Sequence, residues 1–394
     1  MYKYVVSVCF GCLFSFGLSA QDMGVDQVLE QISKNNRQIK AYQSFMSSRN
    51  LANKSENNLQ DPQVSAFYLP FGEHETDDYY EYQVSQRFEF PTVYGARSKR
   101  IEKQEALLEL EYESLRQEVL LNAKKQLLEL QVLQKRKDLE QKRVEQAKEV
   151  YDQIQRLFDA EQIGILELNK AKVAWIQKQF EIEQIEVRIE SLLRDLQKLN
   201  GGEAIEVGQL QISEETQLLS QDAIWQEKLA EDPEVKALQA QTELAEQQVK
   251  LEKNKVLPDL SLGYNYQGVS SSNYSGFLGG ISIPLWNSNN KVKAAQARYE
   301  YEQSNSDFVQ AELYTTFLEK YQRYQLLNEK FLEYRETFQD LNSEELLFKA
   351  YELGELSFLD YYREVEFYRQ AYNRMLEMEK ELLQLKAELL KHQL

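Results

Sequence analysis

The sequence predicts an exported α+β protein built as a tandem duplication, in which each copy supplies a helix, two short β-strands and a very long helix pair. The first observation is a repeated order of landmarks. Ile39-Lys40-Ala41 matches Val235-Lys236-Ala237, and Pro62 matches Pro258, both at an offset of 196 residues. Self-similarity at one period is the sequence signature of a repeated architecture.

The register of the repeat extends through both copies. Pro91 matches Pro284 at an offset of 193, and Phe158-x-Ala160-x-x-x-Gly164 matches Phe348-x-Ala350-x-x-x-Gly354 at 190. The slow drift of the offset indicates that the second copy has lost a few residues. The long helix pairs are expected to turn back near Gly164 and Gly354. We therefore divide the mature chain into a first repeat (21–200), a linker (201–221) and a second repeat (222–394).

The second observation is the length of uninterrupted helix. Between Gly95 and Gly164 there is neither glycine nor proline, which permits a helix of about 100 Å. Apolar residues step by three and four through the helical stretches, as in antiparallel coiled coils. The predicted seams include Val144, Ala147, Tyr151, Ile154 and Phe158; Ile182, Ile185, Ile189, Leu192, Leu196 and Leu199; Tyr314, Phe317, Tyr321, Tyr324 and Phe331; and Met375, Met378, Leu382, Leu385 and Leu389.

The third observation is period-two alternation in four short runs, which predicts β-strands at 63–71, 80–90, 259–267 and 276–284. Successive strand residues point to opposite faces, and one face of each run is apolar and aromatic. Runs of about ten residues with this pattern are typical of membrane β-barrels; a soluble amphipathic sheet is the alternative. The residues predicted to face lipid are Tyr80, Tyr82, Val84, Phe88, Phe90, Leu260, Leu262, Tyr264, Tyr266, Phe277, Ile281 and Ile283.

The first residues predict a secretory signal. Lys3 supplies the positive charge, residues 5–18 form an apolar core, and Ala20 precedes the expected cleavage site. This core is shorter than the stretch of about 20 residues that a transmembrane helix needs, so we expect residues 1–20 to be removed. Both cysteines, Cys9 and Cys12, lie in this segment. The mature chain is therefore predicted to lack disulfides, thiolate metal sites and a lipid anchor.

The composition limits the partners. The chain carries 64 acidic and 46 basic residues, with a net charge of −18. Nucleic-acid binding needs a concentrated basic face, so nucleic acid is not an expected partner. Outside the signal no stretch of about 18 apolar residues occurs, and an exported chain of this kind is expected to enter a membrane only as strands.

Four strands do not close a barrel, and an open sheet edge is not tolerated in hydrocarbon. Each chain must therefore complete its sheet with copies of itself. This requirement predicts an obligate ring of identical chains joined by head-to-tail contacts. Rings with different numbers of subunits would meet this requirement.

Taken together, these features resemble the TolC family of outer-membrane efflux proteins over essentially the whole mature chain. A heavy-metal branch of that family, CzcC- or CusC-like, has a similar architecture, but its lipid-anchored members carry a cysteine after cleavage that is lacking here. The motifs that carry the resemblance are Asp61-Pro62-Gln63-Val64-Ser65, Leu257-Pro258-Asp259-Leu260-Ser261, Ile283-Pro284-Leu285, Ile163-Gly164-Ile165-Leu166 and Leu353-Gly354-Glu355-Leu356.

The resemblance implies a homotrimer with a twelve-stranded barrel in the outer membrane of a Gram-negative-type cell, in contact with its lipid. A long α-helical coiled-coil tube would continue the barrel through the periplasm. The implied partners are a periplasmic adaptor (membrane fusion) protein and an inner-membrane pump, for example of the RND type, in a tripartite pump. In family members the helical turns contact the adaptor, which assigns docking to Ile163, Gly164, Ile165, Leu353, Gly354 and Glu355.

Family members commonly narrow the periplasmic end with a ring of aspartates after the second glycine turn. Asp360 matches the first such position, whereas Arg363 stands where a second acidic residue often lies. Lys170 occupies the corresponding position after the first turn. The resemblance therefore implies a periplasmic gate made by Asp360 and braced by Arg363 or Lys170. A solvated carboxylate on a helix face is the alternative for Asp360.

Motifs for catalysis are lacking. His74 and His392 do not suffice for a metal site, and no glycine-rich phosphate loop or nucleophile motif occurs. We expect no enzyme activity, no metal and no cofactor. Two alternatives to an efflux channel stay open. One is the exit duct of a type I protein secretion system, which would use the same fold; the other is a periplasmic coiled-coil adaptor or scaffold, which would lack lipid-facing strands.

Overall fold

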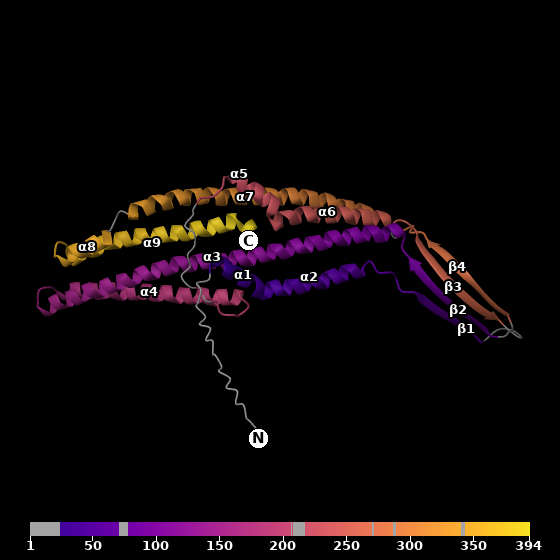
Figure 1. Cartoon of the computed structure of the whole chain (residues 1–394), viewed down its shortest axis with the longest axis horizontal. Helices are drawn as coiled ribbons and strands as arrows, with labels where there is room; N and C mark the ends of the chain where they lie inside the picture. The colour runs from indigo at the N-terminus through magenta and orange to yellow at the C-terminus, as the bar shows by residue number, and fades with distance from the viewer. Residues whose placement is uncertain are drawn as a thin grey trace, which may run out of the picture.

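The computed structural model describes residues 24–70, 78–205, 207, 217–269, 272–286, 289–339 and 343–394. The chain is elongated, with a four-stranded sheet at one end and helices along the remaining length (Figure 1). The C-terminus lies near the middle of the long axis (Figure 1). The predicted signal, His74 and part of the predicted linker lie outside the described residues.

Each half of the chain contributes the same series of elements. The single helix over 91–159 in the first half corresponds to two helices in the second half, over 291–339 and 343–352, and residues 340–342 between them lie outside the described residues. The first half contains α1 (Val25–Asn35), α2 (Arg37–Ser55), β1 (Gln63–Leu69), β2 (Tyr79–Phe88), α3 (Pro91–Asp159) and α4 (Ile165–Leu199). The second half contains α5 (Gln221–Glu231), α6 (Pro233–Asn254), β3 (Asp259–Val269), β4 (Ser272–Ser282), α7 (Lys291–Gln339), α8 (Ser343–Glu352), α9 (Phe358–Leu389) and the 3₁₀ turn η1 (Lys391–Gln393).

The same kind of polar cap begins the second helix of each half. Asn36 lies between α1 and α2, and its Oδ1 accepts hydrogen bonds from the backbone N–H groups of Gln38 at 2.9 Å and Ile39 at 3.1 Å. Asp232 lies between α5 and α6, and its Oδ1 accepts from the N–H of Glu234 at 2.9 Å. Asn and Asp are preferred N-caps. The two caps are separated by the offset of the first sequence landmarks, so the duplication extends to the helix ends.

The strands form one antiparallel sheet in the order β1-β2-β3-β4. The two pairs β1–β2 and β3–β4 come from different halves and meet between β2 and β3. There, Tyr82 is paired with Tyr266 and Val84 with Tyr264. The duplicated hairpins therefore form a single sheet, whose two edges are β1 and β4.

β1 ends at Leu69 instead of residue 71, and two further predicted strands also end earlier than expected. β2 ends at Phe88, and Phe90 is the N-cap residue of α3 instead of a strand residue. β4 ends at Ser282, so Ile283 lies beyond the strand. Proline accounts for the early end of β2, because Pro91 occupies the first turn of α3, where its missing N–H costs no hydrogen bond. Its sequence counterpart Pro284 does not begin a helix but lies in the connection to α7.

The helices pack around three buried clusters. One is formed by α1 to α4, and a second by α5, α7 and α9. The third cluster lies at the end farthest from the sheet and joins α3, α4, α8 and α9, so that both halves of the chain share it (Figure 1). Among the described residues, no helix combines the length and apolar character needed to cross a bilayer.

The predicted seams are largely buried in these clusters. Met375, Met378, Leu382, Leu385 and Leu389 all lie in the second cluster. On α3 the seam is rotated from the prediction. Most of the predicted residues there are only partly buried, and the fully buried line includes charged residues. The charged residues on this line include Glu140 and Arg143.

Candidate functional site

The sheet has one apolar face and one polar face. The register carries the apolar row across all four strands, because residues that pair directly share a face. Tyr264, for example, lies between Val84 and Phe277. The row consists of Val64, Ala66 and Tyr68 on β1; Tyr80, Tyr82, Val84 and Phe88 on β2; Leu260, Leu262, Tyr264 and Tyr266 on β3; and Phe277 and Ile281 on β4.

The opposite face carries the charged and amide side chains. Glu81 accepts hydrogen bonds from Asn265 on the next strand and from the hydroxyl of Tyr79, the latter at 2.6 Å. Gln83, Ser85 and Arg87 continue this face along β2. The face is less uniform near the loops, where Phe67, Leu69 and Tyr274 interrupt it. Ten of the twelve residues predicted to face lipid lie on the apolar face; the other two, Phe90 and Ile283, lie outside the strands.

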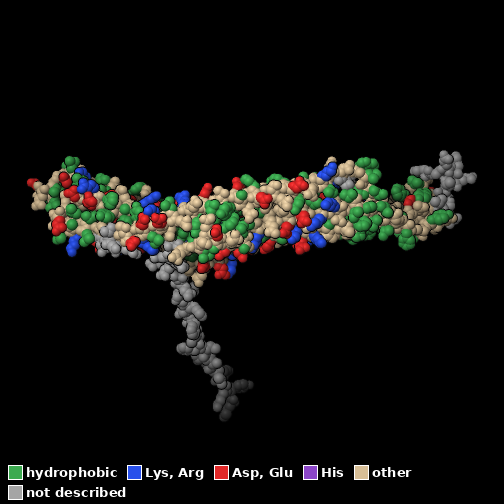
Figure 2. All heavy atoms as spheres, turned by 90° about the horizontal axis from the view of Figure 1, so that it is seen from above, with side chains coloured by type: hydrophobic (Ala, Val, Ile, Leu, Met, Phe, Trp, Pro, Cys, Tyr) green, Lys and Arg blue, Asp and Glu red, His purple; other side chains and the backbone are tan. Residues whose placement is uncertain are grey.

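Charge is divided between the two halves where they meet along the helices. In the part of the chain that the structure describes, every ion pair between the halves has its cation in the first half and its carboxylate in the second. Acidic and basic side chains are spread along the helical part of the surface, and few lie over the sheet (Figure 2). The ion pairs that join the first half to the second are Lys103–Glu243, Lys125–Glu388, Lys135–Glu379, Arg136–Glu377, Arg143–Glu344 and Lys178–Glu366.

One of these pairs, Arg143–Glu344, is part of a buried ionic cluster. The cluster lies close to the end of the molecule farthest from the sheet, which is called the tip below. Arg143 is 1% exposed, and its Nη1 donates to Oε1 of Glu140 on the same helix at 2.6 Å. Its other partner, Glu344, is in the first turn of α8 and also accepts from Nε of Arg369 on α9 at 3.3 Å. Asn373 on α9 accepts from Nη1 of Arg143 at 3.3 Å. The cluster therefore links α3 of the first half to α8 and α9 of the second half.

The cluster is balanced in charge, with two arginines and two glutamates. Burial alone lowers the pKa of Arg143, but its hydrogen bonds to Glu344 and Glu140 and their charges raise it above its ordinary value. Oε2 of Glu140 is buried without a hydrogen-bond partner in the described structure. A signal for this cluster was present in the sequence: Glu140, Arg143, Ala147 and Val150 keep the spacing of three and four, so charged residues stand at seam positions.

The two helical turns predicted to dock an adaptor lie together at the tip (Figure 1). Gly164 is the N-cap residue of α4, and Gly354 has a φ of +74°, which favours glycine. Ile163 packs partly against the third cluster, whereas Ile165 and Leu353 are exposed. Glu355 is also exposed. Of the six residues predicted to dock an adaptor, two apolar side chains, Ile165 and Leu353, and one carboxylate, Glu355, are therefore exposed.

The predicted gate residues occupy the start of α9 and the adjacent face of α4. Ser357 caps α9: its Oγ accepts from the N–H of Asp360 at 3.2 Å and donates to Oδ2 of Asp360 at 2.6 Å. Nη2 of Arg363 lies 3.7 Å from Oδ1 of Asp360 and 3.2 Å from Oε1 of Glu364. The structure therefore joins Asp360 to Arg363. No ion pair between Lys170 and Asp360 occurs among the described residues.

Lys170 instead lines a groove of 490 Å³ between α4 and α9. Its walls are mostly apolar, with Leu166 and Val173 on one side and Leu359 on the other. Tyr362 crosses the groove, and its hydroxyl donates to Oε1 of Gln177 at 3.3 Å. Burial raises the pKa of Tyr362, so the phenol stays neutral and can donate this bond.

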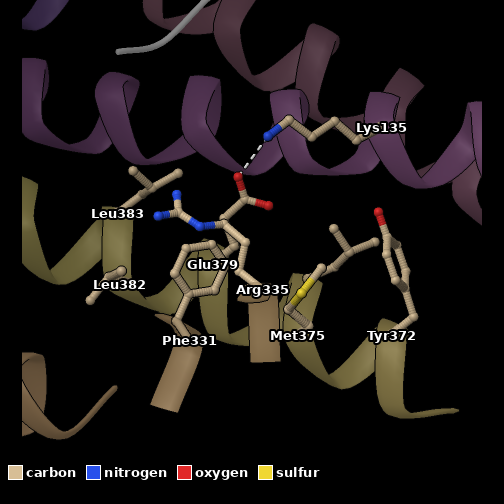
Figure 3. Close-up of a pocket in the computed structure, with 9 residues that line it drawn as sticks. Lys135, Phe331, Arg335, Tyr372, Met375, Glu379, Leu382 and Leu383 are labelled. Atoms are coloured by element: carbon tan, nitrogen blue, oxygen red, sulfur yellow. Dashed lines mark hydrogen bonds and ion pairs between the residues drawn. The ribbon is translucent and has the colours of Figure 1, made fainter. Parts of the chain in front are cut away.

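A smaller cavity of 140 Å³ lies farther from the tip, between the helices α3, α7 and α9 (Figure 3). Phe331 and Met375 line it with apolar surface, and the pair formed by Lys135 and Glu379 closes it at 2.6 Å. Because the two charges satisfy each other, this cavity is part of the packing of the wall. Among the described residues there is no group of three or more His, Cys, Asp or Glu side chains that could hold a metal ion.

The fold is that of outer-membrane channel proteins. The chain matches a solved structure of CusC, described for its folding and transmembrane channel formation, with a TM-score of 0.77, 14% identity and coverage of 93% of this chain and 91% of CusC. For the outer membrane channel CmeC of Campylobacter jejuni the TM-score is 0.71, with 15% identity and coverage of 93% and 85%. For the outer membrane protein VceC of Vibrio cholerae it is 0.70, with 15% identity and coverage of 94% of each chain.

A family relationship is visible in the sequence as well. Residues 224–345 match the family of outer membrane efflux proteins. No curated protein sequence matches this chain. The resemblance to the TolC family predicted from the sequence is therefore confirmed, by the family match within the second half and by a shared fold over nearly the whole chain.

Proposed function

We propose that this protein is the outer-membrane channel of a tripartite efflux pump. The observation that carries the proposal is a sheet with one apolar face that continues into helices of great length. At 1.5 Å per residue, the 69 residues of α3 extend about 100 Å. A two-faced sheet suits lipid on one side and water on the other, and the helices then form the wall of a tube in the periplasm.

The sheet is completed by other copies of the chain. Its edges, β1 and β4, have a strand neighbour on one side only, and an open edge is not tolerated in the hydrocarbon of a bilayer. Three chains would supply twelve strands, a number within the range of known membrane barrels. We propose a homotrimer in which β4 of one chain pairs with β1 of the next.

The channel is proposed to conduct passively, with no enzyme activity of its own. The pump in the inner membrane would supply the energy, and a periplasmic adaptor would join the pump to the tip. The exposed side chains of Ile165, Leu353 and Glu355 support docking at the tip, because they form a small apolar surface beside a carboxylate. The seal of the resting tip is assigned to Asp360 and Arg363, with Lys170 beside the groove.

Opening is proposed to move α8 and the tip of α9 away from the first half. The buried cluster of Arg143, Glu344 and Arg369 then acts as the main restraint, since it ties α8 and α9 to α3. Opening would separate these charges from their partners while Arg143 is still largely buried, so the resting state would be held until the adaptor binds.

The test is ion conduction by the purified protein in planar lipid bilayers. Discrete conductance steps are expected for the wild-type protein, and larger or more frequent steps for Arg143→Met, in which the restraint is removed. The matched control is Arg194→Met, which breaks an exposed pair with Glu190 that is not part of the proposed gate. If neither the wild type nor Arg143→Met changes the conductance of the bilayer, the proposed channel function is wrong.

A further inference from the structure

The connection that follows β4 exposes a run of large apolar side chains. Ile283, Leu285 and Trp286 are 66%, 63% and 79% exposed. They belong to the segment Ile283-Pro284-Leu285-Trp286, which lies between the end of the sheet and α7. An exposed tryptophan beside exposed leucine and isoleucine is unfavourable in water, because each side chain leaves a large apolar area solvated. These three side chains are therefore expected to be covered by another apolar surface.

The position of the segment indicates what that occupant is. It lies at the end of the sheet where the helices begin, and it continues the apolar row of β4, in which Phe277 is 93% exposed and Ile281 is also exposed (Figure 1). Leu59 and Leu257, just before β1 and β3, are exposed at the same end of the sheet. The apolar surface of the sheet thus ends in a band of exposed apolar residues, with Trp286 as its largest member.

The first half of the chain lacks this feature. There, only Glu89 and Phe90 separate β2 from α3, and Phe90 is partly buried. Glu89 forms an ion pair with Arg97 on α3 at 2.6 Å, which closes the connection with a polar contact. A short polar connection therefore suffices to join strand and helix. The longer, apolar connection of the second half has a different role.

We propose that the side chains of Ile283, Leu285 and Trp286 form an apolar membrane anchor, without any covalent lipid, that lies at the periplasmic interface of the outer membrane. Indole is suited to this boundary, because its ring is apolar and its N–H can donate to headgroups or water. The first turn of α7 carries Lys293 and no acidic residue, which suits the phosphates of lipid headgroups. The proposal rests on the proposed function, since it takes the apolar face of the sheet to be in the membrane.

The test measures the depth of Trp286 in a bilayer. The chain has three tryptophans. Trp175 stacks on Tyr151, with ring centroids 5.4 Å apart, and Trp225 packs against Phe317 at 5.3 Å, so phenylalanine can replace both with little loss of packing. The variant Trp175→Phe/Trp225→Phe leaves Trp286 as the one tryptophan. It is reconstituted in phosphatidylcholine vesicles that carry nitroxide quenchers near the headgroup or deep in the acyl chains.

The anchor predicts stronger quenching of Trp286 by the shallow nitroxide than by the deep one, with little quenching by aqueous iodide. Strong quenching by iodide without quenching by lipid would place Trp286 in water and overturn the proposal. Protection from both quenchers would show that a neighbouring copy of the chain covers the tryptophan, and this result would overturn it too.

A second single-tryptophan variant separates this proposal from the proposed function. Trp175→Phe, Trp225→Phe and Trp286→Phe are combined with Phe277→Trp, which places the probe on the apolar face of β4. If this probe is quenched by lipid nitroxides while Trp286 is not, the anchor is wrong and the membrane sheet stands. If lipid nitroxides quench neither probe, the membrane sheet itself is wrong and the anchor fails with it.

Discussion

The guanidinium of Arg143 on α3 forms a two-point ion pair with the carboxylate of Glu344 on α8: Nη2 lies 2.6 Å from Oε1, and Nε lies 3.2 Å from Oε2. Two parallel hydrogen bonds between a guanidinium and a carboxylate are stronger and more directional than a single charged contact. This pair connects residues that are 201 positions apart in the sequence. It is therefore a tertiary contact that holds the two halves of the duplicated chain together close to the tip.

Replacing Arg143 with methionine should loosen the tip. The change leaves Glu140 buried without a counter-ion, and removing one partner of a buried pair costs about 3–5 kcal/mol. We expect faster cleavage of α8 and α9 by chymotrypsin and a lower midpoint of thermal unfolding. Arg194→Met is the control, since the exposed pair it removes, with Glu190 on α4, contributes only about 0–1 kcal/mol. Equal protease sensitivity in the two variants would contradict a restraining role for Arg143.

The stability of the helical wall should depend on pH through Glu388. Burial alone raises the pKa of this carboxyl. The hydrogen bonds and charges of Lys125 and Lys320 together lower it by more than burial raises it, so the pKa of Glu388 lies below the ordinary 4.5. A carboxyl with a lowered pKa stabilises the fold above pH 4.5, and this stabilisation is lost as the pH falls through the lowered value.

Glu388→Gln should therefore unfold at a lower temperature than the wild type at neutral pH, and the two should converge in acid below the pKa of the folded state. Thermal unfolding followed by circular dichroism between neutral pH and acid measures this difference. Glu190→Gln, which affects an exposed pair with Arg194, should change little at any pH. If the thermal midpoints of the wild type and Glu388→Gln differ by the same amount at every pH, the predicted pH dependence is wrong.

Gly201→Ala should destabilise the end of the first repeat. Gly201 has a φ of +72°, and a Cβ there would lie 2.5 Å from the carbonyl oxygen of Asn35, a backbone atom that cannot move aside. The backbone conformation alone should cost about 1–3 kcal/mol. The control is Gly95→Ala in α3, where a Cβ meets no atom within 4 Å and alanine should stabilise the helix by up to about 1 kcal/mol. Thermal midpoints that shift in the same direction would contradict this prediction.

The two faces of the sheet should respond differently to a new charge. Phe277→Arg places a cation on the apolar face, where the cost near the middle of a bilayer is about 2–4 kcal/mol. Gly276→Arg places the same side chain on the opposite face of the same strand, where a Cβ meets no atom within 4 Å. We expect Phe277→Arg to reduce the yield of folded protein in membranes and Gly276→Arg to leave it unchanged. Equal yields would argue against lipid on the apolar face.

Asp360→Ala combined with Arg363→Ala should raise the single-channel conductance in planar bilayers. The two side chains form an ion pair at the start of α9, and removing them would widen a ring built from three copies. The matched control is Glu190→Ala with Arg194→Ala, an exposed pair of the same kind on α4. If conductance and cation selectivity match the wild type, these residues are not part of the gate.

The parts of the fold that depend on local pattern could be predicted from the sequence. Alternation over Tyr80, Tyr82 and Val84 predicts a strand with an apolar face, because the period of a strand is two residues. The spacing of Met375, Met378 and Leu382 predicts a buried helical seam for the same reason. The strand ends were less well predicted, since Phe90 and Ile283 continue the apolar pattern while the backbone has already left the sheet.

The parts that depend on long-range pairing could not be predicted. Nothing local to Glu344 shows that Arg143 is its partner, and no proline or glycine lies near the C-terminal end of α7 at Gln339. Charged residues at seam positions were a signal for the buried cluster, but their partners depend on how the two halves align. The exposure of Trp286 likewise follows from the different connections after β2 and β4.

The most direct test of the central claim is the mass and location of the mature protein. Cells are fractionated, and the protein extracted from the outer membrane in detergent is examined by light scattering and by electrophoresis with and without heating. The account predicts an outer-membrane complex of three chains that separates into single chains on heating. A single chain that is soluble without detergent would contradict the shared barrel, and the four strands would then belong to a periplasmic scaffold.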